Sequence, residues 1–474
     1  MTRVSGLAGA RGITANSKDV KKDYIFVAVR GNSLDGGRFI DEALARGARL
    51  IVVDKDISDL KKSAPGAGFL KTGNCREFLA RASREFYGDP SAKMRIAGIT
   101  GTNGKTTVSY LIEAIAAGGG YPCGVIGTIN YRFKGKKFAA GNTTPGPERV
   151  QELLAGMLKD GVKYCAMEVS SHALDQGRVS GVKFRKAIFT NLTQDHLDYH
   201  KNLKNYFLAK AKLFRSLSAR STAVINNDDA CGRKLKRLTG AGVMTYGIRR
   251  DSDVMARDIV FGIAGTEFTL AVPGKALKIR SLLVGRHNIY NLLAAASWGI
   301  SEGFKLEDIK AVFEKFRKVP GRLEPAGRGN EKRIFVDYAH TPDALFNVLG
   351  ALRPLVQGRL IVVFGCGGER DKLKRPLMGK IATDLADFAI ITSDNPRSED
   401  PGMIIRDILK GIRKRNYAVA ADRKEAIRKG LLMAGRDDCL LVAGKGHEDY
   451  QVLKNKKLKF SDRKVISECL KLMK

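Results

Sequence analysis

The segment GITGTNGKTT, Gly98 to Thr107, constrains the fold of this chain more than any other part of its sequence. It follows the apolar run RIAGI, and apolar residues recur at helical spacing from Val108 to Ile115 behind it. A strand, a glycine loop and a helix in this order are the context of a phosphate-binding P-loop. In such a loop Gly101 and Gly104 let backbone N–H groups approach phosphates, Lys105 supplies a positive charge, and Thr106 can ligate Mg²⁺.

The loop departs at one position from the strict pattern GxxxxGK[ST], because Ile99 stands where that pattern has its first glycine. The first glycine is therefore shifted along the chain, and the segment predicts a variant P-loop.

The whole chain alternates strand-like and helix-like segments, which predicts an α/β fold. A chain of 474 residues is too long for one core, and we expect three domains, over 1–90, 91–318 and 319–474. YGDPSAKM and KVPGRLEP are the expected connections between them. The last part contains five strand-like runs separated by helical stretches, the pattern of a Rossmann-like sheet, whose ligands bind at the carboxyl ends of the strands.

Composition narrows the class of protein. The seven cysteines form no CxxC pair, so neither a disulfide framework nor a zinc site is expected. No apolar run reaches membrane-spanning length and the N-terminus has no signal-peptide core, so we expect a cytoplasmic protein without membrane insertion. The net charge of +34 suits nucleic acid or a solvated surface around anionic ligands. Because the charge is spread over the chain, we favour the second interpretation.

Polar residues follow two further strand-like runs. Glu168 ends the run before VSSH, where a carboxylate can reach the Mg²⁺ of the P-loop or simply cap a helix. The segment NLTQDHLDYH offers a second metal or phosphate cluster; its candidate members are Asp195, His196, Asp198 and His200, the last of which we expect only to cap or pack. The spacing of Lys210 and Lys212 on an amphipathic helix indicates, by itself, a solvated face.

The tetrapeptide DNPR, from Asp394 to Arg397, ends another strand-like run. Asn-Pro initiates turns and Asp caps helices, so a structural turn explains most of it. A turn does not explain an arginine at the end of a buried strand.

Twelve segments in order closely resemble the Mur ligases, the ATP-dependent amide-forming enzymes of peptidoglycan precursor synthesis. They are NSKDV, GTNGKTT, NTTP, MEVSSHALDQGRV, TNLTQDHLDYH, YFLAKAKLF, GRHNIYN, PGRLE, DYAHTPDAL, GERDKLKRPLMG, DNPR and GKGHEDYQ. Within the family they are most similar to the third ligase, which extends UDP-N-acetylmuramoyl-L-alanyl-D-glutamate by one amino acid. The resemblance runs nearly end to end and implies an N-terminal UDP-binding domain, a central ATP-binding domain and a C-terminal amino-acid-binding domain, acting as a monomer.

The resemblance also implies roles for individual residues around ATP. Lys105, Glu168, His196 and Lys210 would be catalytic, with Lys210 carbamylated. Mg²⁺ would be bound by Thr106, Glu168, His196 and the modified Lys210. ATP would be bound by Gly101, Thr102, Asn103, Gly104, Lys105, Thr106, Thr107, Asn288, Asn291, Arg322 and Asp337.

Two further sets follow from the same resemblance. The UDP-linked dipeptide would be bound by Ser17, Thr143, Thr144, Ser170, Gln176 and Arg178, although Gly37 stands where relatives are expected to have a histidine. The incoming amino acid would be bound by Arg370, Asp394, Asn395, Pro396, Arg397, Gly444 and Glu448. An arginine at the last position of DNPR implies meso-diaminopimelate, whose distal carboxylate it can bind bidentately while Glu448 takes the distal ammonium.

Three alternatives stay open at this point. Two belong to the same superfamily: a ligase that adds L-lysine, and an enzyme similar to folylpolyglutamate synthase. The third is a basic P-loop ATPase that binds nucleic acid, which would need clustered Lys and Arg and leaves DNPR and GKGHE unexplained.

Overall fold

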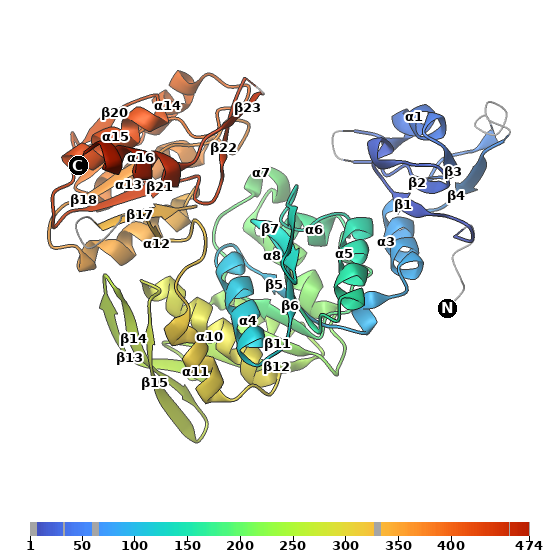
Figure 1. The fold of residues 1–474 in the computed structure, drawn as a ribbon, viewed down its shortest axis with the longest axis horizontal. Helices are drawn as coiled ribbons and strands as arrows, with labels where there is room; N and C mark the ends of the chain where they lie inside the picture. Colours follow the sequence, from blue (N-terminus) through green and yellow to red (C-terminus); the bar gives the residue numbers. More distant parts are fainter. Residues whose placement is uncertain (1–6, 32–33, 59–65, 327–332, 455, 474) are drawn as a thin grey trace.

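The computed structural model describes residues 7–31, 34–58, 66–326, 333–454 and 456–473, and within these ranges the strands form three main sheets and one small hairpin. The three sheets lie in three units in chain order, with the central unit between the other two (Figure 1). They account for residues 12–71, 95–281 and 324–443. The domain boundaries near 90 and 318 stay a prediction.

The N-terminal unit has a four-stranded parallel sheet with a helix on each face. Its elements are β1 (Gly12–Thr14), β2 (Tyr24–Val27), α1 (Ile40–Ala45), β3 (Ala48–Val53), β4 (Gly68–Lys71) and α3 (Cys75–Phe86). The side chain of Asn74 accepts hydrogen bonds from the backbone N–H groups of Arg76 and Glu77, which starts α3 at this point.

The central unit has an eleven-stranded sheet in the order β15-β14-β13-β12-β11-β10-β5-β9-β6-β7-β8. The pairs from β13 to β6 are parallel, and antiparallel strands extend both edges. Its strands are β5 (Arg95–Thr100), β6 (Cys123–Ile126), β7 (Asn130–Phe133), β8 (Lys136–Ala139), β9 (Tyr164–Glu168), β10 (Lys186–Phe189), β11 (Thr222–Asn226), β12 (Gly242–Gly247), β13 (Val254–Gly262), β14 (Gly265–Val272) and β15 (Lys275–Ser281).

Helices cover both faces of this parallel region, so its strands are apolar almost throughout. They are α4 (Lys105–Gly118), α5 (Pro147–Lys159), α6 (Ser171–Asp175), α7 (Leu197–His200), α8 (Leu203–Arg215), α9 (Ala230–Leu235), α10 (Arg286–Ser301) and α11 (Leu306–Lys315). Helices α4, α10 and α11 contribute to one hydrophobic core, which includes Trp298 of α10. Helices α5 and α8 contribute to a second hydrophobic core.

The C-terminal unit has a six-stranded sheet in the order β16-β17-β21-β18-β19-β20. Its elements are β16 (Glu324–Pro325), β17 (Arg333–Asp337), α12 (Pro342–Leu352), β18 (Leu360–Phe364), α13 (Lys374–Leu385), β19 (Phe388–Ile391), α14 (Pro401–Leu409), β20 (Tyr417–Val419), α15 (Arg423–Met433), β21 (Cys439–Ala443), β22 (Tyr450–Leu453), β23 (Lys456–Lys459) and α16 (Asp462–Leu472). The five predicted strands are all parallel, and the prediction missed the two-residue antiparallel strand β16 at the edge. Two residues are too few to show a strand-like pattern.

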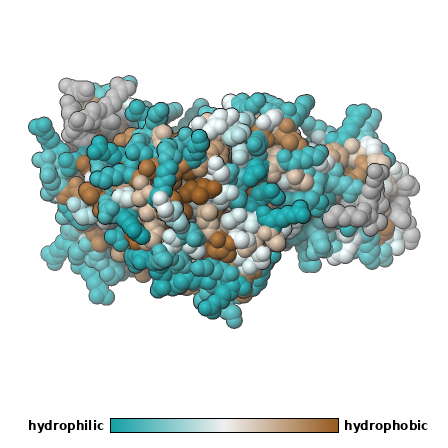
Figure 2. Space-filling model, turned by 90° about the horizontal axis from the view of Figure 1, so that it is seen from below, coloured by the Kyte–Doolittle hydropathy of each residue, from teal (hydrophilic) through white to brown (hydrophobic). Residues whose placement is uncertain are grey.

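The surface is mainly hydrophilic, as the high content of charged residues requires, and hydrophobic side chains gather only in small separate areas on the face shown in Figure 2. All seven cysteines are free thiols, and six of them are buried. No helix in the described ranges has the length and apolar character needed to cross a membrane.

Candidate active site

The glycine loop lies between β5 and α4, as the sequence predicts for a P-loop. Gly101 has a φ of +153° and Gly104 a φ of +89°, and a Cβ at Gly101 would lie 1.8 Å from Thr190 Oγ1. The backbone therefore passes through a space that only glycine fits. Lys105 Nζ donates to the carbonyls of Gly101 and Thr102, both at 2.9 Å, and burial lowers its pKa.

Thr106 joins the loop to two other parts of the chain. Its Oγ1 lies 3.0 Å from Glu168 Oε2, and Arg322 Nη2 of the C-terminal unit donates to the same hydroxyl at 3.1 Å. Glu168 is 1% exposed at the end of β9 and also accepts hydrogen bonds from the backbone N–H and hydroxyl of Thr128. A buried carboxylate beside a threonine hydroxyl is an oxygen donor set of the type that Mg²⁺ prefers, so these two residues fit the predicted ion.

Lys210 lies inside the same centre. It is 1% exposed, its Nζ donates to the Gly101 carbonyl at 2.9 Å, and it lies 4.4 Å from the centre of the Tyr206 ring. Burial and, next, the charge of Lys105 lower its pKa well below the usual value. The interpretation of this position as a solvated face is therefore wrong, whereas Lys212 two residues on is exposed and pairs with Asp175.

His196 follows the carboxyl end of β10 and begins α7 with a φ of +55°. Its ring lies 4.8 Å from the ring of His172, and its Nε2 lies 3.4 Å from Asp195 Oδ2. Burial lowers its pKa to about 4, so the ring is neutral near pH 7. His200 is buried and its Nε2 lies 3.0 Å from Ser171 Oγ, so this residue packs.

The described ranges contain no group of three or more His, Cys, Asp or Glu side chains arranged to hold a metal ion. The second metal cluster suggested by NLTQDHLDYH is therefore absent from this part of the chain. The predicted Mg²⁺ set has only Glu168 and His196 of these residue types, so it stays a prediction.

The remaining predicted ATP residues surround the loop from two sides. On α10, Asn291 Nδ2 donates to Asn288 Oδ1 at 3.0 Å, and a Cβ at Gly104 would lie 2.3 Å from Asn291 Oδ1. In the C-terminal unit, Asp337 accepts hydrogen bonds from the backbone N–H groups of Leu323 and Ala339. Asp337 thus fixes the backbone beside Arg322, and burial raises its pKa.

The predicted dipeptide residues form a second group next to the first. Thr144 Oγ1 donates to the Glu168 carbonyl at 2.8 Å, and Thr143 Oγ1 lies 3.1 Å from Thr128 Oγ1. Ser170 caps α6 and its backbone N–H donates to Thr144 Oγ1. The group therefore contacts the backbone of Glu168 directly and the Glu168 carboxylate through Thr128.

A cavity of about 180 Å³ lies between the N-terminal and central units and includes two of these predicted residues, Gln176 and Arg178. Arg178 donates to Gln176 Oε1 at 2.6 Å and to the Thr144 carbonyl at 2.9 Å. The N-terminal unit contributes Val29, Arg76 and Leu79 to its lining. Ser17 instead donates to Glu42 Oε2 at 2.7 Å and is buried.

The predicted amino-acid residues gather at the carboxyl ends of β18, β19 and β21. Arg397 has a φ of +56°, its backbone pairs with β22, and its Nη1 donates to the Gly368 carbonyl at 2.6 Å. Asn395 Nδ2 donates to Glu448 Oε2 at 2.8 Å. A Cβ at Gly444 would lie 2.6 Å from Asp394 Oδ2, which has no hydrogen-bond partner in the described part of the chain. Pro396 is buried and Arg370 is exposed on the neighbouring loop.

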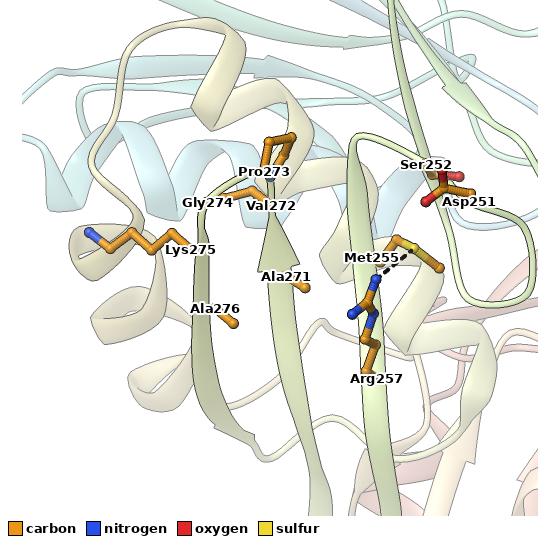
Figure 3. Close-up of a pocket in the computed structure, with 10 residues that line it drawn as sticks. All are labelled: Asp251, Ser252, Met255, Arg257, Ala271, Val272, Pro273, Gly274, Lys275 and Ala276. Carbon is orange, nitrogen blue, oxygen red and sulfur yellow. Dashed lines mark hydrogen bonds between the residues drawn. The ribbon is translucent and has the colours of Figure 1, made fainter.

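A larger cavity of about 520 Å³ lies elsewhere, on the strands at the far edge of the central sheet (Figure 3). Its lining comes from the start of β13 and the turn between β14 and β15, and includes Arg257 and Lys275. It contains none of the predicted site residues.

Three residues that contact the predicted site residues were not themselves predicted. Thr128 binds Glu168, and it follows β6 with no motif to mark it. Asp343 Oδ2 accepts a hydrogen bond from Asn103 Nδ2 at 2.6 Å and so connects α12 to the P-loop. Lys445 donates to both Asn395 and Glu448. Asp343 and Lys445 lie within DYAHTPDAL and GKGHEDYQ, so these two motifs were the available signal.

Comparison with known proteins identifies the family of this chain. The model of the Mur ligase middle domain matches residues 99–299, that of the Mur ligase glutamate ligase domain matches 321–446, and that of the Mur ligase family catalytic domain matches 10–87. The chain is 44% identical over 460 residues to a UDP-N-acetylmuramoyl-L-alanyl-D-glutamate--2,6-diaminopimelate ligase of Clostridium tetani, an alignment that covers 97% of this chain and 94% of the relative. The chain belongs to the Mur ligase family.

Members of this family are ATP-dependent enzymes that form amide bonds, and the three units of this Mur ligase are those of the family fold. The relative of the same name from Bacillus cereus is 43% identical, with 97% of this chain and 93% of the relative covered. A solved structure of a ligase of that name has a TM-score of 0.70 at 33% identity and covers 98% of this chain and 95% of its own. A Thermotoga maritima MurF structure in complex with ADP shares the fold at 17% identity, with a TM-score of 0.68 and 99% of each chain covered.

Proposed function

We propose that this Mur ligase adds meso-2,6-diaminopimelate to UDP-N-acetylmuramoyl-L-alanyl-D-glutamate, with ATP, in peptidoglycan precursor synthesis. The names of its relatives at 41–44% identity support this reaction. We further propose that it works as a monomer in the cytoplasm, with residues 1–90, 91–318 and 319–474 as its UDP-binding, ATP-binding and amino-acid-binding domains. No nucleic-acid partner is needed to explain the charge.

Arg397 is the observation that carries the choice of amino acid. Its Nη1 is held by the carbonyls of Gly368 and Asn395, while Nε and Nη2 have no hydrogen-bond partner among the described residues. This free edge of the guanidinium can bind a carboxylate through two parallel hydrogen bonds. Diaminopimelate has a distal carboxylate and L-lysine does not, so lysine would leave the arginine unpaired, which is a strong basis for discrimination.

The nucleotide would lie on the P-loop. The backbone N–H groups of residues 101–107 would bind its phosphates, while Asn288, Asn291 and Asp337 would shape the site around it. Thr106, Glu168, His196 and a carbamylated Lys210 would hold Mg²⁺, which when bound neutralises phosphate charge. The burial and lowered pKa of Lys210 support its modification, because a neutral amine can react with CO₂ to give a carboxylate-like group.

The chemistry then follows from the positions of the charged groups. A free carboxylate of the D-glutamyl residue attacks the γ-phosphate of ATP, which forms an acyl phosphate and releases ADP. Lys105 and Arg322 stabilise the charge that develops on the transferred group. The amine of the incoming amino acid attacks the acyl carbon, and phosphate leaves from the tetrahedral intermediate. Arg178, Thr143, Thr144 and Ser170 orient the dipeptide for the first step, and Arg397, Asn395 and Glu448 orient the amine for the second.

An amino-acid panel tests this proposal. ADP release would be measured with the UDP-linked dipeptide and with meso-diaminopimelate, L-lysine or L-ornithine. We expect release only when the dipeptide and diaminopimelate are both present. A preference for lysine would overturn the choice of amino acid, and stimulation by DNA in place of the dipeptide would overturn the ligase assignment.

A further inference from the structure

Lys445 is a fully buried lysine in the loop that follows β21. It is 0% exposed and stands between Gly444 and Gly446, which have φ values of +114° and +54°. Its ammonium donates to Asn395 Oδ1 at 3.2 Å and to Glu448 Oε2 at 2.9 Å, and lies 5.5 Å from the centre of the Tyr450 ring. A buried cation of this kind requires a partner, and its partner here belongs to the amino-acid pocket.

The same contacts fix the orientation of Asn395. Its Oδ1 accepts from Lys445 and from the backbone N–H of Val452 at 2.9 Å, so its Nδ2 must face Glu448 Oε2. Lys445 and the Val452 N–H can only donate, which excludes the flipped amide. Lys445 therefore positions two of the residues proposed to bind the amino acid.

Among the predicted amino-acid residues and Lys445, the charges of the buried and half-buried side chains balance, whereas Arg370 is exposed and solvent screens its charge. Asp394 and Glu448 are acidic, and Arg397 and Lys445 are basic. The neighbouring Arg423 is fully buried and is neutralised by Asp462, to which its Nε and Nη2 both donate at 2.8 Å. Two negative and two positive side chains thus lie in the loops that follow β19 and β21.

We propose that Lys445 determines the amino-acid specificity of this ligase, by offsetting the charge of Glu448 so that the pocket is neutral and favours a distal zwitterion over a lone distal ammonium. The inference rests on the proposed function. The distal end of diaminopimelate carries one carboxylate and one ammonium and is neutral, whereas the distal end of L-lysine has a charge of +1. Without the positive charge of Lys445, the pocket would carry an excess negative charge that attracts the lysine side chain more than the zwitterion.

The first test is Lys445→Met, which keeps an unbranched side chain only one atom shorter and removes its charge. The measured quantity is the ratio of kcat/KM for meso-diaminopimelate to kcat/KM for L-lysine, with the KM for ATP as a second readout. We expect the ratio to fall by about tenfold or more, with little change in the KM for ATP. Lys456→Met is the matched control, because Lys456 is an exposed lysine on the adjacent β23.

Two variants separate charge from packing. In the pair Lys445→Met with Glu448→Gln, the base and the acid are removed together, so the ratio should recover toward the wild-type value. Glu448→Gln alone should raise the ratio, because it leaves the pocket with excess positive charge. Glu448 is partly exposed, so this variant tests the proposal even where Lys445→Met does not fold.

An unchanged ratio in Lys445→Met, no recovery in the double variant, or a fall in the ratio in Glu448→Gln would overturn the proposal. The amino-acid panel with the wild-type enzyme distinguishes failure of the proposed function from failure of the proposal for Lys445. A wild-type enzyme that does not use diaminopimelate contradicts the proposed function itself, whereas a diaminopimelate-specific wild type with unresponsive variants contradicts only the role of Lys445.

Discussion

The phosphate-binding centre and the amino-acid pocket are built in different ways. The P-loop is one continuous segment, from β5 through residues 101–104 into α4, and its left-handed φ angles occur at glycines. The amino-acid pocket is assembled from separate loops after β18, β19 and β21, joined by hydrogen bonds to β22, and its left-handed φ angles occur at Arg397 as well as at Gly444 and Gly446.

The difference shows what holds the functional groups of each site in position. In the P-loop, local backbone geometry holds the groups proposed to act on phosphate, and their chemistry does not depend on which amino acid is added. In the amino-acid pocket, side chains such as Asn395 and Lys445 hold other side chains in place. A change of substrate therefore requires few substitutions in the second site and none in the first.

Lys105→Ala should abolish most of the catalytic contribution of the P-loop. Because this charge is proposed to stabilise the transferred phosphate, we expect kcat to fall by about 10³-fold, measured as ADP release at saturating substrates. The fall should be the same for every amino acid in the panel. Lys93→Ala, at an exposed lysine just before β5, should retain wild-type activity.

Arg397→Ala should impair the amino-acid pocket and leave ATP binding at the P-loop unchanged. We expect kcat/KM for diaminopimelate to fall by about 10²-fold, since the distal carboxylate loses its partner, while ATP binding measured by calorimetry stays unchanged. Equal losses in both quantities would contradict the separation of the two regions. Arg436→Ala, an exposed arginine of the same unit, is the control.

Arg423→Met tests how much the buried ion pair next to the amino-acid pocket stabilises the fold. Arg423 also donates to the carbonyls of Ser393 and Ala443, and its loss would leave Asp462 buried and unpaired. We expect a loss of about 3–5 kcal/mol in the free energy of unfolding, measured by denaturant titration. Lys424→Met removes the neighbouring exposed pair with Glu468 and should cost less than about 1 kcal/mol.

Asn103→Ala tests the contact between the P-loop and the C-terminal unit. It removes the hydrogen bond to Asp343, and we expect a change of only a few-fold in the KM for ATP, because one hydrogen bond contributes about 1 kcal/mol. A double-mutant cycle with Asp343→Asn measures the coupling. Additive effects would show that this contact does not connect the two regions.

The sequence predicts the two regions unequally well. The P-loop and the strand-end position of Glu168 follow from local patterns, because a glycine loop and a strand end are recognisable within ten residues. Periodicity misplaces Lys210 on a solvated face, since it cannot show that the helix packs its lysine toward the Gly101 carbonyl. The family resemblance corrects this position.

Contacts between distant segments account for what was missed. Thr128 contacts Glu168 across 40 positions of sequence, and Asp343 contacts Asn103 across 240. Lys445 lies within the motif GKGHEDYQ, but the motif alone does not show that this lysine is buried and contacts Asn395 and Glu448. The role of such residues depends on tertiary packing, which no local pattern encodes.

The Thr106 hydroxyl is shared between Glu168 of the central unit and Arg322 of the C-terminal unit. In the proposed function this hydroxyl binds the Mg²⁺ of ATP, so we expect the nucleotide to change these contacts and to link its affinity to the position of the C-terminal unit. Such linkage is reciprocal. If ATP changes the affinity for the amino acid by some factor, the amino acid changes the affinity for ATP by the same factor. We therefore expect the Thr106 hydroxyl to couple the binding of the two substrates.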